Sequence, residues 1–196
     1  IAARDLSRAQ AMADQIKEST GNPNVDVGEL ELDKPNSVRA FANNYLANHT
    51  ELNLLINNAG VMACPLSRTE QGWGMQFATN HLGHFLLTHH LLDQVKQAAS
   101  GRIVILSSAA HSFAPSMGVE FDNLDASRGY SPMRAYGQSK LANLLHARLL
   151  ARKLEGSAVT VNAVHPGVIQ TNLGRDGGGL MKLTGLLAKP FMKTIP

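Results

Sequence analysis

A tyrosine and a lysine stand four residues apart in Tyr136-Gly137-Gln138-Ser139-Lys140, within a segment whose pattern predicts a helix. Residues four apart lie on the same face of a helix, one above the other. A neighbouring ammonium favours the phenolate and lowers the pKa of the phenol. Tyr136 is therefore a candidate proton donor or acceptor for a carbonyl–alcohol pair. An ordinary tyrosine beside a solvated lysine is the alternative, because this spacing is short and degenerate.

Two serines and a turn of small residues follow two apolar runs of the chain. Ser107 and Ser108 come directly after residues 103–106, where a hydroxyl could hydrogen-bond a substrate carbonyl as charge develops on its oxygen. Asn57-Asn58-Ala59-Gly60 follows residues 52–56, and its small residues would let the backbone approach a ligand. Each motif has a structural alternative, since the serines could cap a turn and Gly60 could take a positive φ in a polar turn.

Pro166-Gly167 and Asn80 also stand at notable places. Pro166-Gly167 follows residues 159–164, where it could flank a ligand or simply end a strand. Asn80 lies inside an apolar helical segment, where a short amide competes for backbone hydrogen bonds and fits poorly. We expect either a functional role for Asn80 or an irregularity in the helix.

The histidines and the cysteine are weaker candidates. Four histidines crowd one predicted helix, namely His81, His84, His89 and His90. Acidic partners at ligand spacing are missing, so we expect them to pack between helices rather than to bind a metal. Cys64 lies near the Asn57–Gly60 motif, but no neighbouring base marks it as a nucleophile.

Elements that alternate along the chain must position these residues. Strands are predicted at residues 1–3, 25–32, 52–56, 103–106 and 159–164, and helices at 7–20, 35–49, 68–99, 133–154 and 180–193. Ser7 and Gln10 have the spacing of a capping box at the start of the first helix. The segment 68–99 reads as one long helix or two joined ones, and residues 111–133 read as an irregular excursion. Gly177-Gly178-Gly179 is a possible hinge before a lid.

This alternation predicts the α/β fold class, with right-handed connections and a parallel sheet covered by helices on both faces. The apolar runs 52–56 and 103–106 are typical of strands that are buried on both sides. Parallel sheets bind ligands at the carboxyl ends of their strands. The candidate residues lie just after the apolar runs, as this rule requires.

Composition narrows the function classes. The chain has 196 residues, 44% of them hydrophobic and 17% charged, with a net charge of +3, which is typical of one soluble globular domain over residues 1–196. The basic residues are scattered, so we expect no nucleic-acid partner. One cysteine excludes an intrachain disulfide, and no run of about 18 apolar residues could span a bilayer.

The ends of the sequence suggest a fragment. The chain opens at Ile1 without an initiator Met and closes on Thr194-Ile195-Pro196. We expect an internal piece truncated at both ends, in which an upstream signal or membrane anchor would not be visible. The compartment stays open, cytoplasmic or membrane-associated on the cytoplasmic side, and a homo-oligomer is possible.

In their order along the chain, these motifs resemble the short-chain dehydrogenase/reductase family. The resemblance rests on Asn57-Asn58-Ala59-Gly60, Ser108, Tyr136-x-x-x-Lys140 and Pro166-Gly167 and covers essentially all 196 residues. More narrowly, Ala3-Arg4-Asp5, Asn80-His81-Leu82-Gly83-His84-Phe85 and Ser139-Lys140-Leu141-Ala142-Asn143 are similar to the retinol dehydrogenase-like branch. The resemblance implies a Rossmann-like, doubly wound parallel sheet that binds NAD(P). The family's glycine-rich turn and final strand are missing, which we ascribe to truncation.

The resemblance also implies a role for each matching residue. Tyr136 would be the catalytic acid/base, Lys140 would hold the nicotinamide ribose and lower the tyrosine pKa, and Ser108 would orient the substrate carbonyl. Asn80 would hold the water that links Lys140 to solvent. Further cofactor contacts are implied for Asp33 at the adenine, for Asn57, Ala59 and Gly60, and for Pro166, Gly167, Val168 and Thr171 around the nicotinamide.

Arg4 indicates the choice of cofactor. A carboxylate at the strand end would accept a hydrogen bond from the ribose 2′-OH of NAD, whereas an arginine nearby accommodates the 2′-phosphate of NADP. Here the strand ends in Ala2-Ala3-Arg4 with Asp5 one step beyond. We therefore predict NADP(H) rather than NAD(H), and the alternative is that Asp5 contacts the ribose.

The sequence thus predicts an NADP-dependent oxidoreductase that interconverts a carbonyl (aldehyde or ketone) and an alcohol of an apolar small molecule by hydride transfer. A catalytically idle NADP(H)-binding sensor or scaffold of the same fold is the first alternative. A lyase or epimerase is another, because fold does not determine the reaction.

Overall fold

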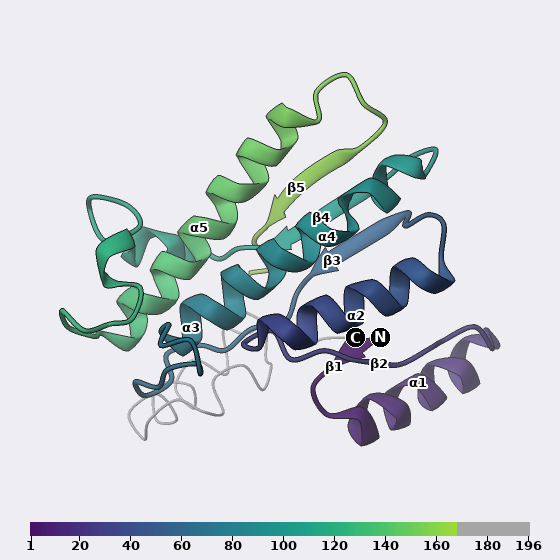
Figure 1. Ribbon diagram of the computed structural model, residues 1–196, viewed down its shortest axis with the longest axis horizontal. Helices are drawn as coiled ribbons and strands as arrows, with labels where there is room; N and C mark the ends of the chain where they lie inside the picture. The colour runs from purple at the N-terminus through teal and green to yellow at the C-terminus, as the bar shows by residue number, and fades with distance from the viewer. Residues whose placement is uncertain (168–196) are drawn as a thin grey trace.

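The computed structural model describes residues 1–167 of the chain (Figure 1). Its strands are β1 (Ala2–Ala3), β2 (Gly28–Glu29), β3 (Leu54–Asn57), β4 (Arg102–Leu106) and β5 (Thr160–Val164). Its α-helices are α1 (Leu6–Thr20), α2 (Pro35–Asn48), α3 (Met75–Phe77), α4 (Gly83–Gln97) and α5 (Pro132–Lys153). A π-helical turn, η1 (Ala78–Leu82), joins α3 to α4, and two 3₁₀ turns, η2 (Ala109–Phe113) and η3 (Phe121–Asn123), precede α5.

The strands form two parallel sheets, as the alternation of elements predicts. β1 pairs with β2, and β3, β4 and β5 pair side by side in that order. Leu55 lies beside Ile103, and Ile103 lies beside Val161. All the pairings between strands are parallel, so each strand ends at the same edge as its neighbour. The α/β fold class is confirmed.

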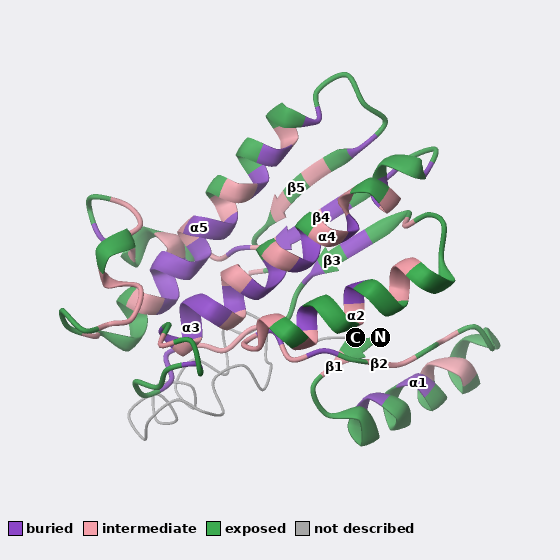
Figure 2. Cartoon of the chain, viewed as in Figure 1, coloured by how far each residue is buried: buried purple, intermediate pink, exposed green. Residues whose placement is uncertain are grey.

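The core lies between the three-stranded sheet and the helices α2, α4 and α5. The sheet contributes alternate residues of β3 and β4, among them Leu55, Ile103 and Ile105. The helices contribute Val38 and Ala42, Leu87, Leu91 and Val95, and Ala147 and Leu150. Figure 2 shows buried segments along these helices and strands. Helix α1 contributes no residue to this core and contacts β1 instead.

One expectation about the strands is wrong. The runs in β3 and β4 are not buried on both sides: Leu54 is 47% and Ile56 53% exposed, whereas Leu55 between them is buried. The helices that build the core all lie on one face of the three-stranded sheet. Within residues 1–167, the outer face of β3 therefore stays open to solvent, and burial alternates along the strand.

Two local expectations are also corrected. The first helix begins at Leu6 with Asp5 as its N-cap, not Ser7, because the Asp5 carboxylate accepts the backbone N–H of Arg8 at 3.0 Å and the Ser7 hydroxyl at 2.9 Å. The strand expected over residues 25–32 is paired only at Gly28 and Glu29, because its partner β1 is itself two residues long.

Other elements agree with the expectations. α2 buries Val38 and Ala42 on the predicted face, and Phe41 and Tyr45 pack against the same core. α5 covers almost the whole range predicted as helix, and residues 109–131 contain only short 3₁₀ turns. The segment 68–99 is helical only from Met75 onward. The predicted lid and its hinge lie outside the described residues. Over residues 1–167, no helix combines the length and the apolar character needed to cross a membrane.

Candidate active site

Helix α5 buries Tyr136 and Lys140 against the carboxyl end of β4. Tyr136 is 4% and Lys140 5% exposed, and the Lys140 Nζ lies 5.6 Å from the centre of the tyrosine ring. The ammonium donates a hydrogen bond to the backbone carbonyl of Leu106 at 3.1 Å. The predicted juxtaposition on one helix face is therefore present, and the lysine is held at the strand end.

A glycine lets the segment after β4 approach this helix. A Cβ at Gly137 would lie 2.6 Å from the carbonyl oxygen of Ala110 and 2.9 Å from the backbone nitrogen of Ala114. Any larger residue would push η2 away from α5. Since Ser108 is the N-cap of η2, Gly137 helps to bring Ser108 to Tyr136.

The two serines after β4 have different contacts. The Ser107 hydroxyl donates to the backbone carbonyl of Lys140 at 2.8 Å, which ties the strand end to the helix. The Ser108 hydroxyl accepts the backbone N–H of Ala110 at 3.2 Å and hydrogen-bonds to Tyr136, an interaction that lowers the tyrosine pKa. Ser107 is thus structural, whereas Ser108 faces the candidate acid/base.

Burial dominates the acid–base properties of the pair. Loss of solvent raises the pKa of Tyr136 above its usual value, and the hydrogen bond with Ser108 offsets part of the rise. Burial lowers the pKa of Lys140 to about 8. The expected lowering of the tyrosine pKa by the lysine is therefore not found in the protein alone. Burial withholds from the phenolate the hydration that it would have in water, and Ser108 rather than Lys140 is the group that lowers the tyrosine pKa.

Asn80 sits in the π-helical turn η1 and is fully buried. Its side-chain Nδ2 donates to the carbonyl of Val61 at 2.9 Å and to the hydroxyl of Ser139 at 3.0 Å. Its Oδ1 accepts the backbone N–H of Val61 at 2.8 Å. The side chain thus joins the loop after β3 to α5, and the helix around it is irregular, as one of the two alternatives expects. A functional role for Asn80 stays a prediction.

The backbone carbonyl of Asn80 also has side-chain partners. It accepts from the side-chain Nδ2 of Asn143 at 3.0 Å and lies 3.1 Å from Nδ1 of His84. A carbonyl oxygen has two lone pairs, and both have protein partners here. A relay water at this carbonyl would have to displace one of these partners, and the expectation that Asn80 holds such a water stays a prediction.

The turn after β3 fits a cofactor at the nicotinamide end. A Cβ at Gly60 would lie 2.9 Å from Asn80 Oδ1 and 3.9 Å from the Lys140 Nζ, and Gly60 is not among the residues with positive φ. The glycine therefore serves a close approach rather than a turn. The buried Asn57 donates to Thr88 at 2.7 Å, and its Oδ1 has no partner within the described residues. Ala59 is exposed beside them. These features and the Lys140 ammonium suit a ribose with its hydroxyl groups.

The remaining predicted cofactor residues follow other strands. Arg4 is exposed just after β1, and Asp33 is partly buried four residues after β2, where it helps to line a groove of about 450 Å³. Pro166 and Gly167 follow β5, with Gly167 at φ +85°. Among residues 1–167, no hydrogen bond joins these residues to the Tyr136 cluster. Val168 and Thr171 lie outside the described residues.

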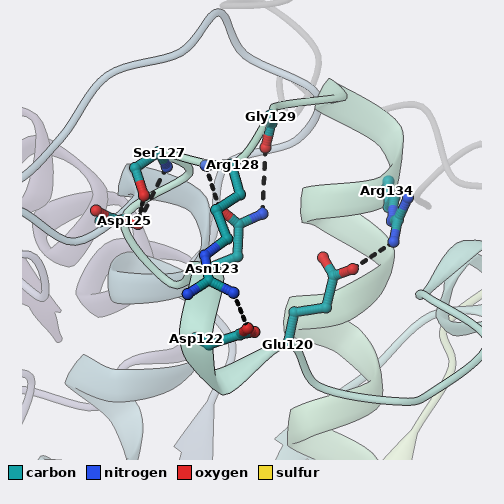
Figure 3. A network of polar contacts seen from close by, with 8 residues as sticks. All are labelled: Glu120, Asp122, Asn123, Asp125, Ser127, Arg128, Gly129 and Arg134. Atoms are coloured by element: carbon teal, nitrogen blue, oxygen red, sulfur yellow. Dashed lines mark hydrogen bonds and ion pairs between the residues drawn. The ribbon is translucent and has the colours of Figure 1, made fainter.

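The excursion before α5 is held by polar contacts that Figure 3 draws. Arg128 pairs with Asp122, and Arg134 on α5 pairs with Glu120. Asn123 accepts the backbone N–H of Arg128 at 2.8 Å and donates to the carbonyl of Gly129. These contacts join parts of the excursion to one another and to α5, and this part of the chain lines a pocket of about 380 Å³.

Three buried residues escaped the sequence reasoning. Asn143 on α5 and Gln76 on α3 are each hydrogen-bonded to two or more other segments. Ser139 on α5 accepts from Asn80 and donates to the carbonyl of Tyr136 on its own helix. The spacing of three between Lys140 and Asn143 places both on one helix face, and that signal could have found Asn143. Gln76 joins Ala63 to Tyr130. No spacing in the sequence predicts these contacts.

Of the histidines expected to pack between helices, His84 is buried as predicted, whereas His89 is exposed. His84 is buried against Asn80, and burial lowers its pKa to about 4. His81 packs between Phe77 and Phe85 with its ring tilted against both. In the part of the chain that the structure describes, no group of three or more His, Cys, Asp or Glu residues could hold a metal ion.

Comparisons with known proteins identify relatives of the chain. Residues 1–189 match the family model described as enoyl-(acyl carrier protein) reductase. The chain is 47% identical to the chloroplastic short-chain dehydrogenase TIC 32 B of Brassica napus, covering 100% of this chain and 63% of that protein. It is 45% identical to human retinol dehydrogenase 11, covering 99% and 60%. The chain thus spans about three fifths of the length of these relatives.

Solved structures give the same fold. A crystal structure of a Mycobacterium paratuberculosis protein is 40% identical and superposes with a TM-score of 0.73, covering 89% of this chain and 60% of that one. A short-chain dehydrogenase of Shigella flexneri, crystallised in complex with NADP, is 22% identical with a TM-score of 0.68, covering 89% and 69%.

Proposed function

The chain belongs to the short-chain dehydrogenase/reductase family, and on this premise we propose that it interconverts a carbonyl compound, aldehyde or ketone, and the corresponding alcohol with NADP(H). One observation carries the proposal. Tyr136 is buried with Lys140 one helical turn away and with the Ser108 hydroxyl as a hydrogen-bond partner. A protonated phenol at the end of a parallel strand is suited to give a proton to a substrate oxygen.

Tyr136, Ser108 and Lys140 would each have a separate role in the reaction. When bound, NADP(H) supplies or accepts the hydride at the substrate carbon. In reduction, the Tyr136 hydroxyl gives its proton to the substrate oxygen, and in oxidation Tyr136 takes that proton back. The Ser108 hydroxyl hydrogen-bonds the same oxygen while negative charge develops on it. The Lys140 ammonium holds the cofactor ribose and stabilises the charge that Tyr136 acquires.

The raised pKa of Tyr136 supports the role of proton donor. A phenol whose pKa lies above its usual value is protonated at neutral pH, which is the form that reduction requires. Lys140, with a pKa of about 8, is still largely an ammonium at pH 7. The two protonation states that the mechanism needs are therefore populated together near neutral pH.

The preference for NADP rests on Arg4. This side chain is exposed immediately after β1, where a guanidinium can pair with a 2′-phosphate in two parallel hydrogen bonds. The relatives named retinol dehydrogenase suggest an apolar aldehyde or ketone as substrate. A relative named TIC 32 is equally similar, so an experiment must identify the substrate.

The test follows NADPH consumption by the full-length protein with a panel of aldehydes and ketones, retinal included. Tyr136→Phe removes the proton donor and keeps the ring, so kcat should fall by about 10²-fold or more. Tyr45→Phe is the matched control, since that tyrosine lies on α2 and donates only to the carbonyl of Glu51. It should keep the parent activity.

Equal turnover by the Tyr136→Phe variant and the parent would contradict the proposed mechanism. NADPH binding without turnover of any substrate would instead favour a sensor or scaffold. Product formed without net consumption of NADPH would favour a lyase or epimerase.

A further inference from the structure

We propose that Asn143 is a positioning residue of this active site, which controls the hydrogen bonding of Lys140 by holding the backbone carbonyls of Leu106 and Asn80. The inference rests on the proposed function, because it concerns the lysine of the same site. It adds a residue to which the proposed mechanism gives no role.

Asn143 lies three residues after Lys140 on α5 and is fully buried. Its Nδ2 donates to the carbonyl of Leu106 at 3.0 Å and to the carbonyl of Asn80 at 3.0 Å. An amide nitrogen carries two N–H groups, so this one is used completely. The side chain thereby joins the end of β4 to the π-helical turn η1 and fixes both relative to α5.

His81 lies against the oxygen of this amide. The Oδ1 of Asn143 lies 3.0 Å from the Nδ1 of His81. Because the two carbonyls can only accept, the amide must direct its nitrogen toward them and its oxygen toward the histidine. His81 Nδ1 must then carry the proton. Burial lowers the pKa of His81, so the neutral ring with a proton on Nδ1 is the form that locks Asn143.

Asn143 and Lys140 share one acceptor. The Leu106 carbonyl accepts one hydrogen bond from the Lys140 ammonium at 3.1 Å and one from the Asn143 amide at 3.0 Å. These two hydrogen bonds occupy both of its lone pairs. Without the amide, the carbonyl would interact with the ammonium alone. A stronger hydrogen bond to the charged form favours that form, so the pKa of Lys140 should rise from its value of about 8.

Other titratable groups surround the lysine and remain in place when Asn143 is changed. Tyr136 lies on the same helix, and His84 on α4 interacts with Lys140 through its charge. His81 in η1 contacts Asn143, and His111 in η2 is bonded to the carbonyl of Ser108. Burial lowers the pKa of Lys140. Since these neighbouring groups stay the same when Asn143 is replaced, a change in that pKa would report the change in hydrogen bonding.

The experiment titrates Lys140 directly. Full-length protein labelled with ¹³C at the lysine Cε is followed by NMR across the alkaline range, and Lys140→Arg identifies the signal. Asn143→Leu keeps the size of the side chain and removes the donor, so the midpoint of Lys140 should rise by about half a pH unit or more.

Gln138→Leu is the matched control. Gln138 is a buried amide on the same helix, and it accepts the backbone N–H of Glu120 at 2.9 Å instead of contacting the lysine or its carbonyl. Both leucine variants should lower the melting temperature, but only Asn143→Leu should move the midpoint. A purely structural role for Asn143 would lower stability without any shift.

A second variant covers the case in which Asn143→Leu does not fold. His81→Phe removes the hydrogen-bond partner of the amide oxygen, and the new ring replaces one that already packs against Phe77 and Phe85. The midpoint of Lys140 should rise in this variant too, by less than in Asn143→Leu. A midpoint equal to that of the parent in every folded variant would overturn the proposal.

The titration needs no substrate, which separates this inference from the proposed function. A shifted midpoint in a protein that reduces no carbonyl would support the role of Asn143 and refute the reductase. In an active protein, kcat should fall while KM for the carbonyl changes little, and the alkaline limb of the pH–rate profile should move upward. Activity with an unmoved limb would refute the role of Asn143.

Discussion

Desolvation and hydrogen bonding, rather than charge pairing, determine the states of the catalytic candidates. Tyr136 and Lys140 lie near each other, yet burial moves the pKa of the phenol up and that of the ammonium down. The lysine therefore loses its proton before the tyrosine does. A decline in activity at alkaline pH should then report Lys140, and Ser108 is the group that eases ionisation of the phenol.

Arg4→Glu tests the coenzyme at the same scale. The change removes a guanidinium after β1 and puts a carboxylate where the 2′-phosphate would bind. A hydrogen bond to a charged group contributes about 1.5–3 kcal/mol, so KM for NADPH should rise at least about 10-fold. KM for NADH should stay the same or fall, because a carboxylate suits a ribose 2′-OH.

The control for this substitution is Arg148→Glu, an exposed arginine on α5, which should leave both constants unchanged. Equal increases in KM for NADPH and NADH in Arg4→Glu would assign ribose recognition to another residue, with Asp5 as the first alternative.

The helix that runs from Met75 to Gln97 is shaped by its π-helical turn. In a π-helix the backbone bonds reach one residue further than in an α-helix, and such turns occur frequently at functional sites. Here η1 carries Asn80, whose carbonyl is bound by side chains of α4 and α5. The irregular turn thus brings a polar backbone group to the site, and α4 continues from Gly83 as a regular helix.

Gly83→Ala tests how tightly this helix packs. Alanine in place of glycine normally stabilises a helix by about 1 kcal/mol. A Cβ at Gly83, however, would lie 2.2 Å from the carbonyl oxygen of Leu32, which is too close for any contact. We expect the opposite sign, a loss of about 1–3 kcal/mol in the free energy of unfolding, measured from urea denaturation.

Asn43→Ala is the control for the sign of the change in the free energy of unfolding. That residue is exposed on α2, so helix propensity alone should act and the variant should be slightly more stable than the parent. A Gly83→Ala variant that is stabilised to the same degree would show that α4 can move away from Leu32 without cost.

For the molecule as a whole, buried histidines connect stability to pH. His84 is buried between α4 and the site, and its pKa is lowered from 6.5 to about 4. His146 on α5 is shifted in the same direction by burial. Between the two pKa values the unfolded chain binds a proton at His84 that the folded chain does not. This contribution is therefore complete above pH 6.5 and is lost as the pH falls toward 4.

The free energy of unfolding should consequently fall by about 2 kcal/mol between pH 7 and pH 5 on account of His84 alone, at about 1.4 kcal/mol per pH unit below 6.5. Urea denaturation at the two pH values measures it. The variant His84→Gln should lose much of this dependence, whereas His89→Gln, at an exposed position of the same helix, should keep it. The same slope in both variants would exclude His84 as the cause.

Local patterns in the sequence determined the elements and the pairing within one helix. The periodicity of residues 133–154 predicts α5, and a spacing of four predicts that Tyr136 and Lys140 share a face. These predictions are confirmed because helix geometry depends only on neighbouring residues. The α/β class follows from the alternation of elements for the same reason.

Only the tertiary structure decided the contacts between segments. Asn143 reaches Leu106 and Asn80, residues 37 and 63 positions away, and the direction of the Tyr136 pKa depends on how much water the packed helices exclude. The open outer face of β3 likewise depends on where the helices lie. Burial and long-range hydrogen bonds arise from the whole packed arrangement, which no local spacing encodes.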